Sequence, residues 1–182
     1  MNMSKLLLAI AALFIGFSAM GQDVVYVDAS VFPVYGKISE ETNERYERLP
    51  ARLEGISRKA VWTRGCHSSG LYIRFRSNST SIHVKWESLF NNHYNHMTDI
   101  CTKGLDLYAL VDGKWRFVAP GRPSADGVST YTLAKNMTPV NREFMLYLSM
   151  YDGVKSIGIG VDKGAYIEQP AVNSPSQEKP IV

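Results

Sequence analysis

The sequence is poor in cysteine, histidine and net charge. It has 2 cysteines and 4 histidines among 182 residues, and 20 Lys and Arg against 17 Asp and Glu give a formal charge of +3. No block of like charges concentrates this small excess, so the composition does not favour nucleic-acid binding. Apolar residues make up 45% of the chain and charged residues 20%, which excludes a disordered, collagen-like or multi-pass membrane protein. What remains is one soluble domain, and its 14 glycines and 8 prolines are typical of a turn-rich β protein.

One long apolar run lies at the N-terminus. Leu6–Phe17 is an unbroken stretch of 12 apolar residues, whereas a helix needs about 20 to span a bilayer. Lys5 precedes it, and the small residues of Ala19-Met20-Gly21 follow. This order predicts a signal peptide over residues 1–21, with a buried N-terminal helix as the alternative. We therefore expect a secreted or periplasmic protein with no membrane segment after cleavage.

Both cysteines lie in the expected mature chain. Cys66 and Cys101 could form one disulfide bond, because the expected compartment is oxidising. A domain of this size can also fold without a bridge. A bridge and two separate buried thiols therefore both stay open.

Short segments of alternating polarity dominate residues 22–170. They are typical of antiparallel strands with one buried face. The expected strands cover residues 24–27, 71–76, 82–86, 106–111, 114–118, 143–151, 155–161 and 165–168, and residues 60–62 lead into the sheet. Asp112-Gly113 predicts a type I′ hairpin turn. We expect an all-β fold, an antiparallel β-sandwich or jelly roll of about nine or ten strands.

The last residues differ in composition. Residues 171–182 are polar and contain proline until Ile181-Val182. This pattern predicts a linker and the start of a further domain, with an ordinary frayed tail as the alternative.

Motifs for catalysis and metal binding are weak. The G-x-S-x-G nucleophile elbow does not occur, and Ser68 and Ser69 beside His67 would point to opposite faces of a strand. We therefore assign no catalytic residue. The H-x2-H-x2-D spacing of His93–Asp99 fits no common zinc template, and we predict no metal and no cofactor.

The stretch Asn91–Asp99 is better suited to contacts. It is rich in Asn, His and Tyr and lies between strands, as binding loops do. Trp62 and Tyr94 add aromatic faces, whereas Trp86 and Trp115 are predicted to lie in the core. The candidate residues for contact with a domain or a ligand are Trp62, His67, Asn91, His93, Tyr94, Asn95 and His96.

Residues 104–108 form the motif G-x-D-L-Y. It is accompanied, in order, by segments at 45–50, 61–62, 67–75, 95–97 and 146–154. Together they resemble the N-terminal domain found ahead of an SGNH/GDSL-type hydrolase domain in secreted bacterial proteins. The resemblance covers nearly the whole mature chain, and Lys179–Val182 resembles the first strand of that hydrolase domain.

This resemblance implies a non-catalytic accessory domain of an SGNH/GDSL esterase. The catalytic serine, the oxyanion-hole residues and the distal Asp-x-x-His of such enzymes would lie after Val182, so none is assigned here. The implied partner is the C-terminal SGNH hydrolase domain of the same protein. Ester hydrolysis is the implied reaction, with deacetylation of a polysaccharide as the narrower form. A free-standing carbohydrate-binding module and a structural docking domain are the alternatives.

The motif residues Gly104, Asp106, Leu107 and Tyr108 carry over from the resemblance with a structural rather than a catalytic role. Strand alternation places Asp106 and Tyr108 on the face opposite Leu107. Asp106 then either faces solvent or a docked domain, or pairs with an arginine such as Arg116 or Arg74. We favour the arginine pair, because a buried, paired carboxylate would fix the hairpin.

Overall fold

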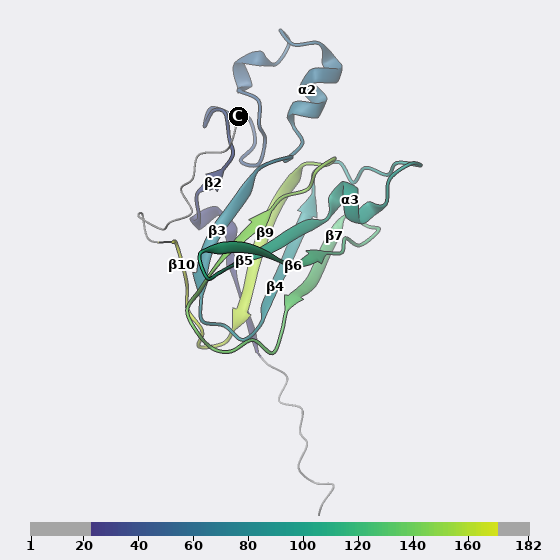
Figure 1. The fold of residues 1–182 in the computed structure, drawn as a ribbon. Coiled ribbons are helices and arrows are strands. Elements are labelled where there is room, and N and C mark those ends of the chain that lie inside the picture. Colours follow the sequence, from purple (N-terminus) through teal and green to yellow (C-terminus); the bar gives the residue numbers. More distant parts are fainter. Residues whose placement is uncertain (1–22, 171–182) are drawn as a thin grey trace, which may run out of the picture.

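A computed structural model describes residues 23–170, which form two antiparallel sheets packed face to face (Figure 1). Sheet A has the strand order β1-β9-β4-β7, and sheet B has the order β10-β3-β8-β5-β6, with β2 also paired to β3. The strands are β1 (Val24–Asp28), β2 (Val34–Tyr35), β3 (Tyr72–Ser77), β4 (Ile82–Ser88), β5 (Leu105–Val111), β6 (Lys114–Gly121), β7 (Val128–Ala134), β8 (Arg142–Tyr147), β9 (Val154–Asp162) and β10 (Ile167–Glu168). The predicted all-β sandwich is confirmed. The predicted signal peptide and linker lie outside the described residues.

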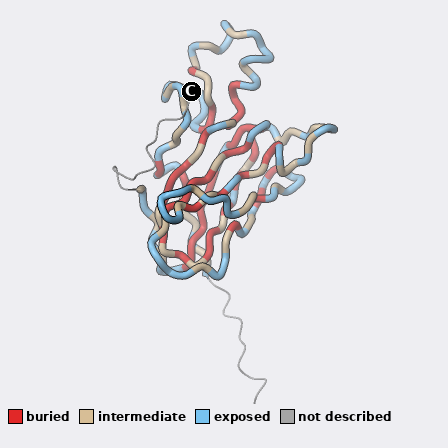
Figure 2. The backbone as a smooth tube through the Cα atoms, viewed as in Figure 1, coloured by how far each residue is buried: buried red, intermediate tan, exposed pale blue. Residues whose placement is uncertain are grey.

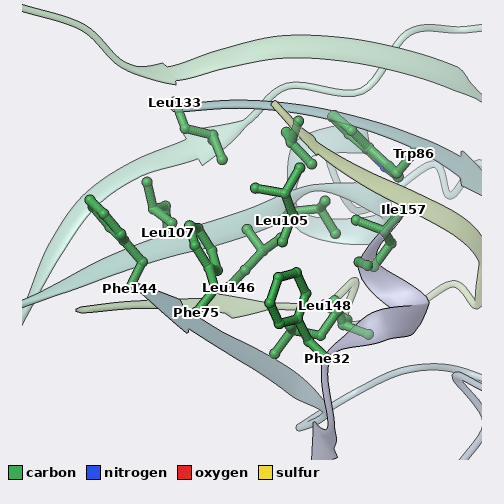
Figure 3. Packing of buried hydrophobic residues seen from close by; sticks show 14 of the residues in the cluster. Phe32, Phe75, Trp86, Leu105, Leu107, Leu133, Phe144, Leu146, Leu148 and Ile157 are labelled. Carbon is green, nitrogen blue, oxygen red and sulfur yellow. The ribbon is translucent and has the colours of Figure 1, made fainter. Parts of the chain in front are cut away.

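The core lies between the two sheets. Alternate residues of β4 and β5 point into it, and Figure 2 shows the buried segments of the strands. Phe75 of β3 and Phe144 of β8 stack with ring centroids 5.3 Å apart, and Trp86 of β4 is 2% exposed (Figure 3). Each large apolar side chain buried in this way contributes about 1.5–3 kcal/mol of transfer free energy.

The tightest turn follows its sequence signal. Asp112 and Gly113 have φ angles of 51° and 72°, as a type I′ turn requires, and they join β5 to β6. Along β9, a Cβ on Gly158 would lie 2.6 Å from the Lys85 side chain. The glycines of this strand therefore allow close packing.

The sequence led us to expect that residues 60–62 lead into the sheet, and this expectation is wrong. Lys59–Gly65 forms the short helix α2, because lysine, alanine and arginine favour helix. The helix ends where a Cβ on Gly65 would lie 2.2 Å from Leu49. Strand β2, strand β7, helix α3 (Asp99–Lys103) and the 3-10 turns η1 (Ala29–Val31) and η2 (Ala51–Leu53) were also missed.

The link between β8 and β9 changes sheet, because β8 belongs to sheet B and β9 to sheet A. This link, the end of α2 and the segment before α3 gather at one end of the sandwich (Figure 1). No helix among residues 23–170 is long and apolar enough to cross a membrane.

Candidate functional site

The G-x-D-L-Y motif forms the start of β5, and its side chains divide between two faces. Leu107 is fully buried in the core, whereas Asp106 and Tyr108 lie on the outer face of sheet B. Gly104 precedes the strand, and a Cβ there would lie 2.2 Å from the carbonyl oxygen of Ile100 in α3. Gly104 and Leu107 therefore stabilise the fold, whereas the side chains of Asp106 and Tyr108 are available for contacts at the surface.

A groove of about 970 Å³ lies over this outer face, and we call it the motif groove. Its walls come from β5, β6 and β8, from α3 and from the turns beside them. Methionine, aromatic and small side chains make up most of its lining. The lining residues are Gly70, Met97, Ile100, Cys101, Gly104, Asp106, Tyr108, Trp115, Pro120, Met145, Tyr147, Leu148 and Met150.

Asp106 makes no hydrogen bond or ion pair with any residue of 23–170. The predicted arginine pair is therefore wrong, since Arg74 binds Glu143 instead, with Nε 2.7 Å from Oε1. Desolvation by the groove walls raises the pKa of the Asp106 carboxyl. The carboxylate thus lies in a mostly apolar groove without a partner from this domain.

A row of aromatic rings crosses the outer face of sheet B beside the groove. We call it the aromatic row; neighbouring ring centroids lie 5.1–5.6 Å apart. It runs from Tyr35 through Tyr72, Tyr147 and Tyr108 to Phe117. Burial raises the pKa values of Tyr72 and Tyr147. The row was missed from the sequence, because its residues come from five strands and only the strand register brings them together.

The buried Arg74–Glu143 ion pair lies within this face. The guanidinium of Arg74 also lies 5.6 Å from the ring centroid of Tyr35 and 5.9 Å from that of Trp115. Trp115 is half-buried on the outer face, so its predicted core position is wrong, whereas that of Trp86 is confirmed. The bulge between Leu107 and Tyr108 shifts the β5–β6 register here.

Residues 89–98 form the segment between β4 and α3, and we call it the contact loop. It is held by Asp152, whose side chain is fully buried. The Asp152 carboxylate accepts hydrogen bonds from the backbone N–H groups of Phe90 at 3.0 Å and Asn92 at 2.6 Å. These bonds fix the backbone at the start of the loop.

A second buried charge contacts side chains in the same part of the contact loop. Lys103 is 0% exposed, and its Nζ lies 2.7 Å from Asn91 Oδ1, 3.2 Å from Asp99 Oδ2 and 3.3 Å from His93 Nε2. His93 Nδ1 lies 3.1 Å from Asp99 Oδ1. The stretch Asn91–Asp99 was predicted as a contact loop, but Lys103 was missed; the Asp99–Lys103 spacing of four residues on a helix is its one sequence signal.

The remaining predicted contact residues lie around this loop. The Tyr94 hydroxyl accepts a hydrogen bond from Arg64 at 2.9 Å, and its ring contacts His96 and Tyr151. Asn95 and His96 are exposed, and His96 Nδ1 lies 3.1 Å from Asn95 Oδ1.

His67 and Trp62 lie further from the tip of the loop. His67 is 3% exposed and packs against Phe90. Trp62 is half-buried on α2, and its side chain makes no hydrogen bond or ring contact with the loop in the described structure. The loop therefore gathers the predicted asparagine, histidine and tyrosine residues but not Trp62.

The two cysteines are free thiols in the structure. Cys66 is buried and Cys101 is exposed beside the motif groove. Burial and the Glu47 carboxylate raise the pKa of Cys66 to about 12. Of the two alternatives, the disulfide is not formed, and only one of the two thiols is buried.

One serine, histidine and aspartate do meet, on sheet A. Ser81 Oγ lies 2.8 Å from His83 Nε2 and hydrogen-bonds to Asp162. Ser81 is 2% exposed, and Asp162 contacts the serine rather than the histidine. Asp162 also accepts a hydrogen bond from the backbone N–H of Thr80 at 2.7 Å, so the cluster fixes a turn. In residues 23–170, no three His, Cys, Asp or Glu side chains are placed to hold a metal ion.

Comparison with known proteins gives a consistent match. The family model named GxDLY, described as the N-terminus of SGNH-hydrolase-type esterases, matches residues 24–167. A solved protein from Bacteroides ovatus, described as a "putative GDSL-like lipase", is 34% identical with a TM-score of 0.77, and the match covers 82% of this chain and 44% of that one. This chain therefore spans less than half the length of that protein.

A second solved structure shows the fold alone. The salicylyl-acyltransferase SsfX3 from a tetracycline biosynthetic pathway is 17% identical with a TM-score of 0.53, over 82% of this chain and 42% of that one. No curated protein in the comparison matches this chain.

Proposed function

Because the chain belongs to the GxDLY family of N-terminal domains of SGNH-hydrolase-type esterases, we propose that it is the non-catalytic accessory domain of a secreted esterase. The observation that carries this proposal is the extent of the match, since residues 24–167 include every strand except the end of β10. The whole sandwich therefore corresponds to a segment that precedes catalytic machinery. Ester hydrolysis would use the serine of the following hydrolase domain as the nucleophile.

The contact loop supplies a surface for the accessory role. Asp152 holds the backbone at the start of the loop and Lys103 holds the side chains of Asn91 and His93, while Asn95 and His96 remain exposed. A loop fixed in advance loses little conformational freedom when it meets a substrate or a domain. We place this loop at the mouth of the esterase active site, where amide and imidazole groups would hydrogen-bond a polar substrate.

The proposed substrate class is an acetylated polysaccharide. Asn and His side chains suit the hydroxyl groups of sugars, whereas a small aryl ester would reach the serine without touching the loop. The loop would thus raise the affinity for the polymeric ester and leave the bond-breaking step unchanged. Such a role affects KM more than kcat.

The first test is the intact mass of the polypeptide that carries this sequence in its native source. A species larger than 20.4 kDa by a further domain of about 100–200 residues supports the proposal. A secreted species near the mass of residues 22–182 contradicts it. Turnover of an aryl acetate by the 182-residue chain alone would also overturn the non-catalytic role.

The second test separates the loop from the chemistry. In the larger protein, Asn95→Ala with His96→Ala should lower kcat/KM for acetate release from an acetylated polysaccharide by about tenfold. The same variant should leave turnover of an aryl acetate unchanged. Thr132→Ala on β7, on the other sheet, is a matched control that should alter neither rate. Equal kcat/KM values for variant and wild type on the polysaccharide would show that the loop does not contact the substrate.

A further inference from the structure

We propose that the motif groove is the surface on which the SGNH hydrolase domain docks. This inference rests on the proposed function and adds to it the place of the domain interface. The groove and the contact loop are distinct but adjacent, since Met97 at the end of the loop also lines the groove. A domain seated in the groove would therefore lie beside the loop.

The two surface residues of the motif carry the first argument. Gly104 and Leu107 are explained by close backbone approach and core packing, but Asp106 and Tyr108 face outward. Asp106 has no hydrogen-bond or ion-pair partner within residues 23–170, although desolvation already raises the pKa of its carboxyl. Asp106 is exposed to water in the free domain, so a domain that covers the groove must supply a donor to this carboxylate to offset the loss of hydration. We place that donor, an N–H group or a cationic side chain, on the hydrolase domain.

The lining of the groove favours a protein over a sugar. Three methionines, a tryptophan and two tyrosines line it, and Asp106 is its one charged residue among the described ones. Protein interfaces are enriched in aromatic residues and methionine and depleted of charge at their centre. Methionine side chains adapt to an irregular apolar partner, whereas a sugar would require more hydrogen-bonding groups.

The position of β10 is consistent with this partner. Strand β10, Ile167–Glu168, belongs to sheet B, and two strands separate it from β5. With strands about 4.8 Å apart, β10 lies roughly 14 Å from the motif strand. The family match ends at residue 167, so a domain that follows would be joined to the sheet that carries the groove. A domain covalently joined to this sheet has a higher effective concentration for docking than a separate protein.

Cys101 provides a direct probe of docking. It is exposed beside the groove, whereas Cys66 is buried with its pKa raised to about 12, so Cys66 is an internal unreactive control. In the full-length protein, iodoacetamide should alkylate Cys101 at least about tenfold more slowly than it alkylates an unstructured peptide covering residues 99–103. A docked domain is the reason, because nothing in residues 23–170 covers this thiol.

Variants at the groove complete the test. In the full-length protein, Asp106→Lys should restore fast alkylation of Cys101, while Asp126→Lys, on an exposed turn outside the groove, should not. Cys66 should stay unreactive in both variants, which shows that the sandwich remains folded. A photo-reactive amino acid incorporated at position 97, on the wall of the groove, should then form crosslinks to peptides of the hydrolase domain.

Each contrary outcome is separable from failure of the proposed function. Fast labelling of Cys101 in a full-length protein that hydrolyses esters overturns docking in the groove and leaves the esterase assignment intact. Crosslinks to a second copy of this domain, or protection that appears only with added oligosaccharide, also overturn it. A protected Cys101 in a protein with no ester hydrolysis supports docking and contradicts the proposed function.

Discussion

The ammonium group of Lys103 lies 3.2 Å from the Asp99 carboxylate, although the Lys103 side chain is completely buried. Lys103 directly precedes the G-x-D-L-Y motif, and its partners His93 and Asn91 belong to the contact loop. The same residue therefore ties the loop to the start of the motif strand. A change on one side of this contact is expected to alter the other.

Replacing Lys103 with methionine should destabilise the domain. The substitution keeps most of the volume but removes the ammonium donor of Asn91 Oδ1 and one of the two partners of the Asp99 carboxylate. A buried polar group left without a partner costs about 1–3 kcal/mol, so the urea midpoint should fall accordingly. Lys163→Met is the matched control, since Lys163 and Asp23 form a pair at 3.1 Å whose side chains are both 71% exposed. An exposed pair contributes about 1 kcal/mol or less; equal losses would contradict the role of the buried lysine.

Stability should fall as the pH decreases through the histidine range. Desolvation, with the nearby charge of Arg64, lowers the pKa of His67 below its ordinary value, and desolvation also lowers the pKa of His83. The unfolded chain then binds protons that the folded chain resists, so stability present above about pH 6.5 is lost below it. His67→Phe should make the urea midpoint depend less on pH between 5 and 8.

The control for this pH dependence is His96→Phe, which changes an exposed imidazole. It should leave the slope of the urea midpoint against pH as in the wild type. Matching slopes for wild type and His67→Phe would show that the buried imidazole does not contribute.

Gly104→Ala should destabilise the domain, because the added methyl group would meet the backbone of α3. An added Cβ would lie 2.2 Å from the Ile100 oxygen and 3.0 Å from the Gly121 oxygen, and both atoms are backbone. Such overpacking costs about 1–3 kcal/mol, measured as the free energy of unfolding. Gly121→Ala is the neighbouring control, because its added Cβ meets no atom closer than 3.4 Å. A similar loss in both variants would show that the α3 contact is not the cause.

Local sequence patterns predicted much of the sandwich. Alternation identified strands such as β4, where Ile82, Val84 and Trp86 are buried as expected. The Asp112-Gly113 signal identified its hairpin, because turn chemistry depends on adjacent residues only. Both kinds of signal are local, and both are confirmed.

The parts that sequence could not give depend on register and on long-range contacts. The aromatic row depends on the strand register that places Tyr72 opposite Tyr147. Arg74 forms its ion pair with Glu143, which is 69 residues away in the sequence. We expected Arg74 or Arg116 to pair with Asp106, because the local sequence does not show which carboxylate an arginine will contact. Lys103 likewise has an ordinary sequence context and becomes buried only through the contact loop.

Breaking the Arg74–Glu143 pair should lower the free energy of unfolding more than any single substitution of an exposed residue in sheet B. Arg74→Met leaves the Glu143 carboxylate buried without its guanidinium, a loss of about 3–5 kcal/mol in the free energy of unfolding. Arg76→Met, two residues along the same strand, removes an exposed contact of 3.9 Å with Glu168 and should cost about 1 kcal/mol or less. Adding Glu143→Leu to Arg74→Met should recover part of the loss, because the double variant no longer buries the carboxylate from which the guanidinium has been removed. Urea denaturation of the four proteins measures these differences, and a double variant less stable than Arg74→Met would show that Glu143 stabilises sheet B by some other contact.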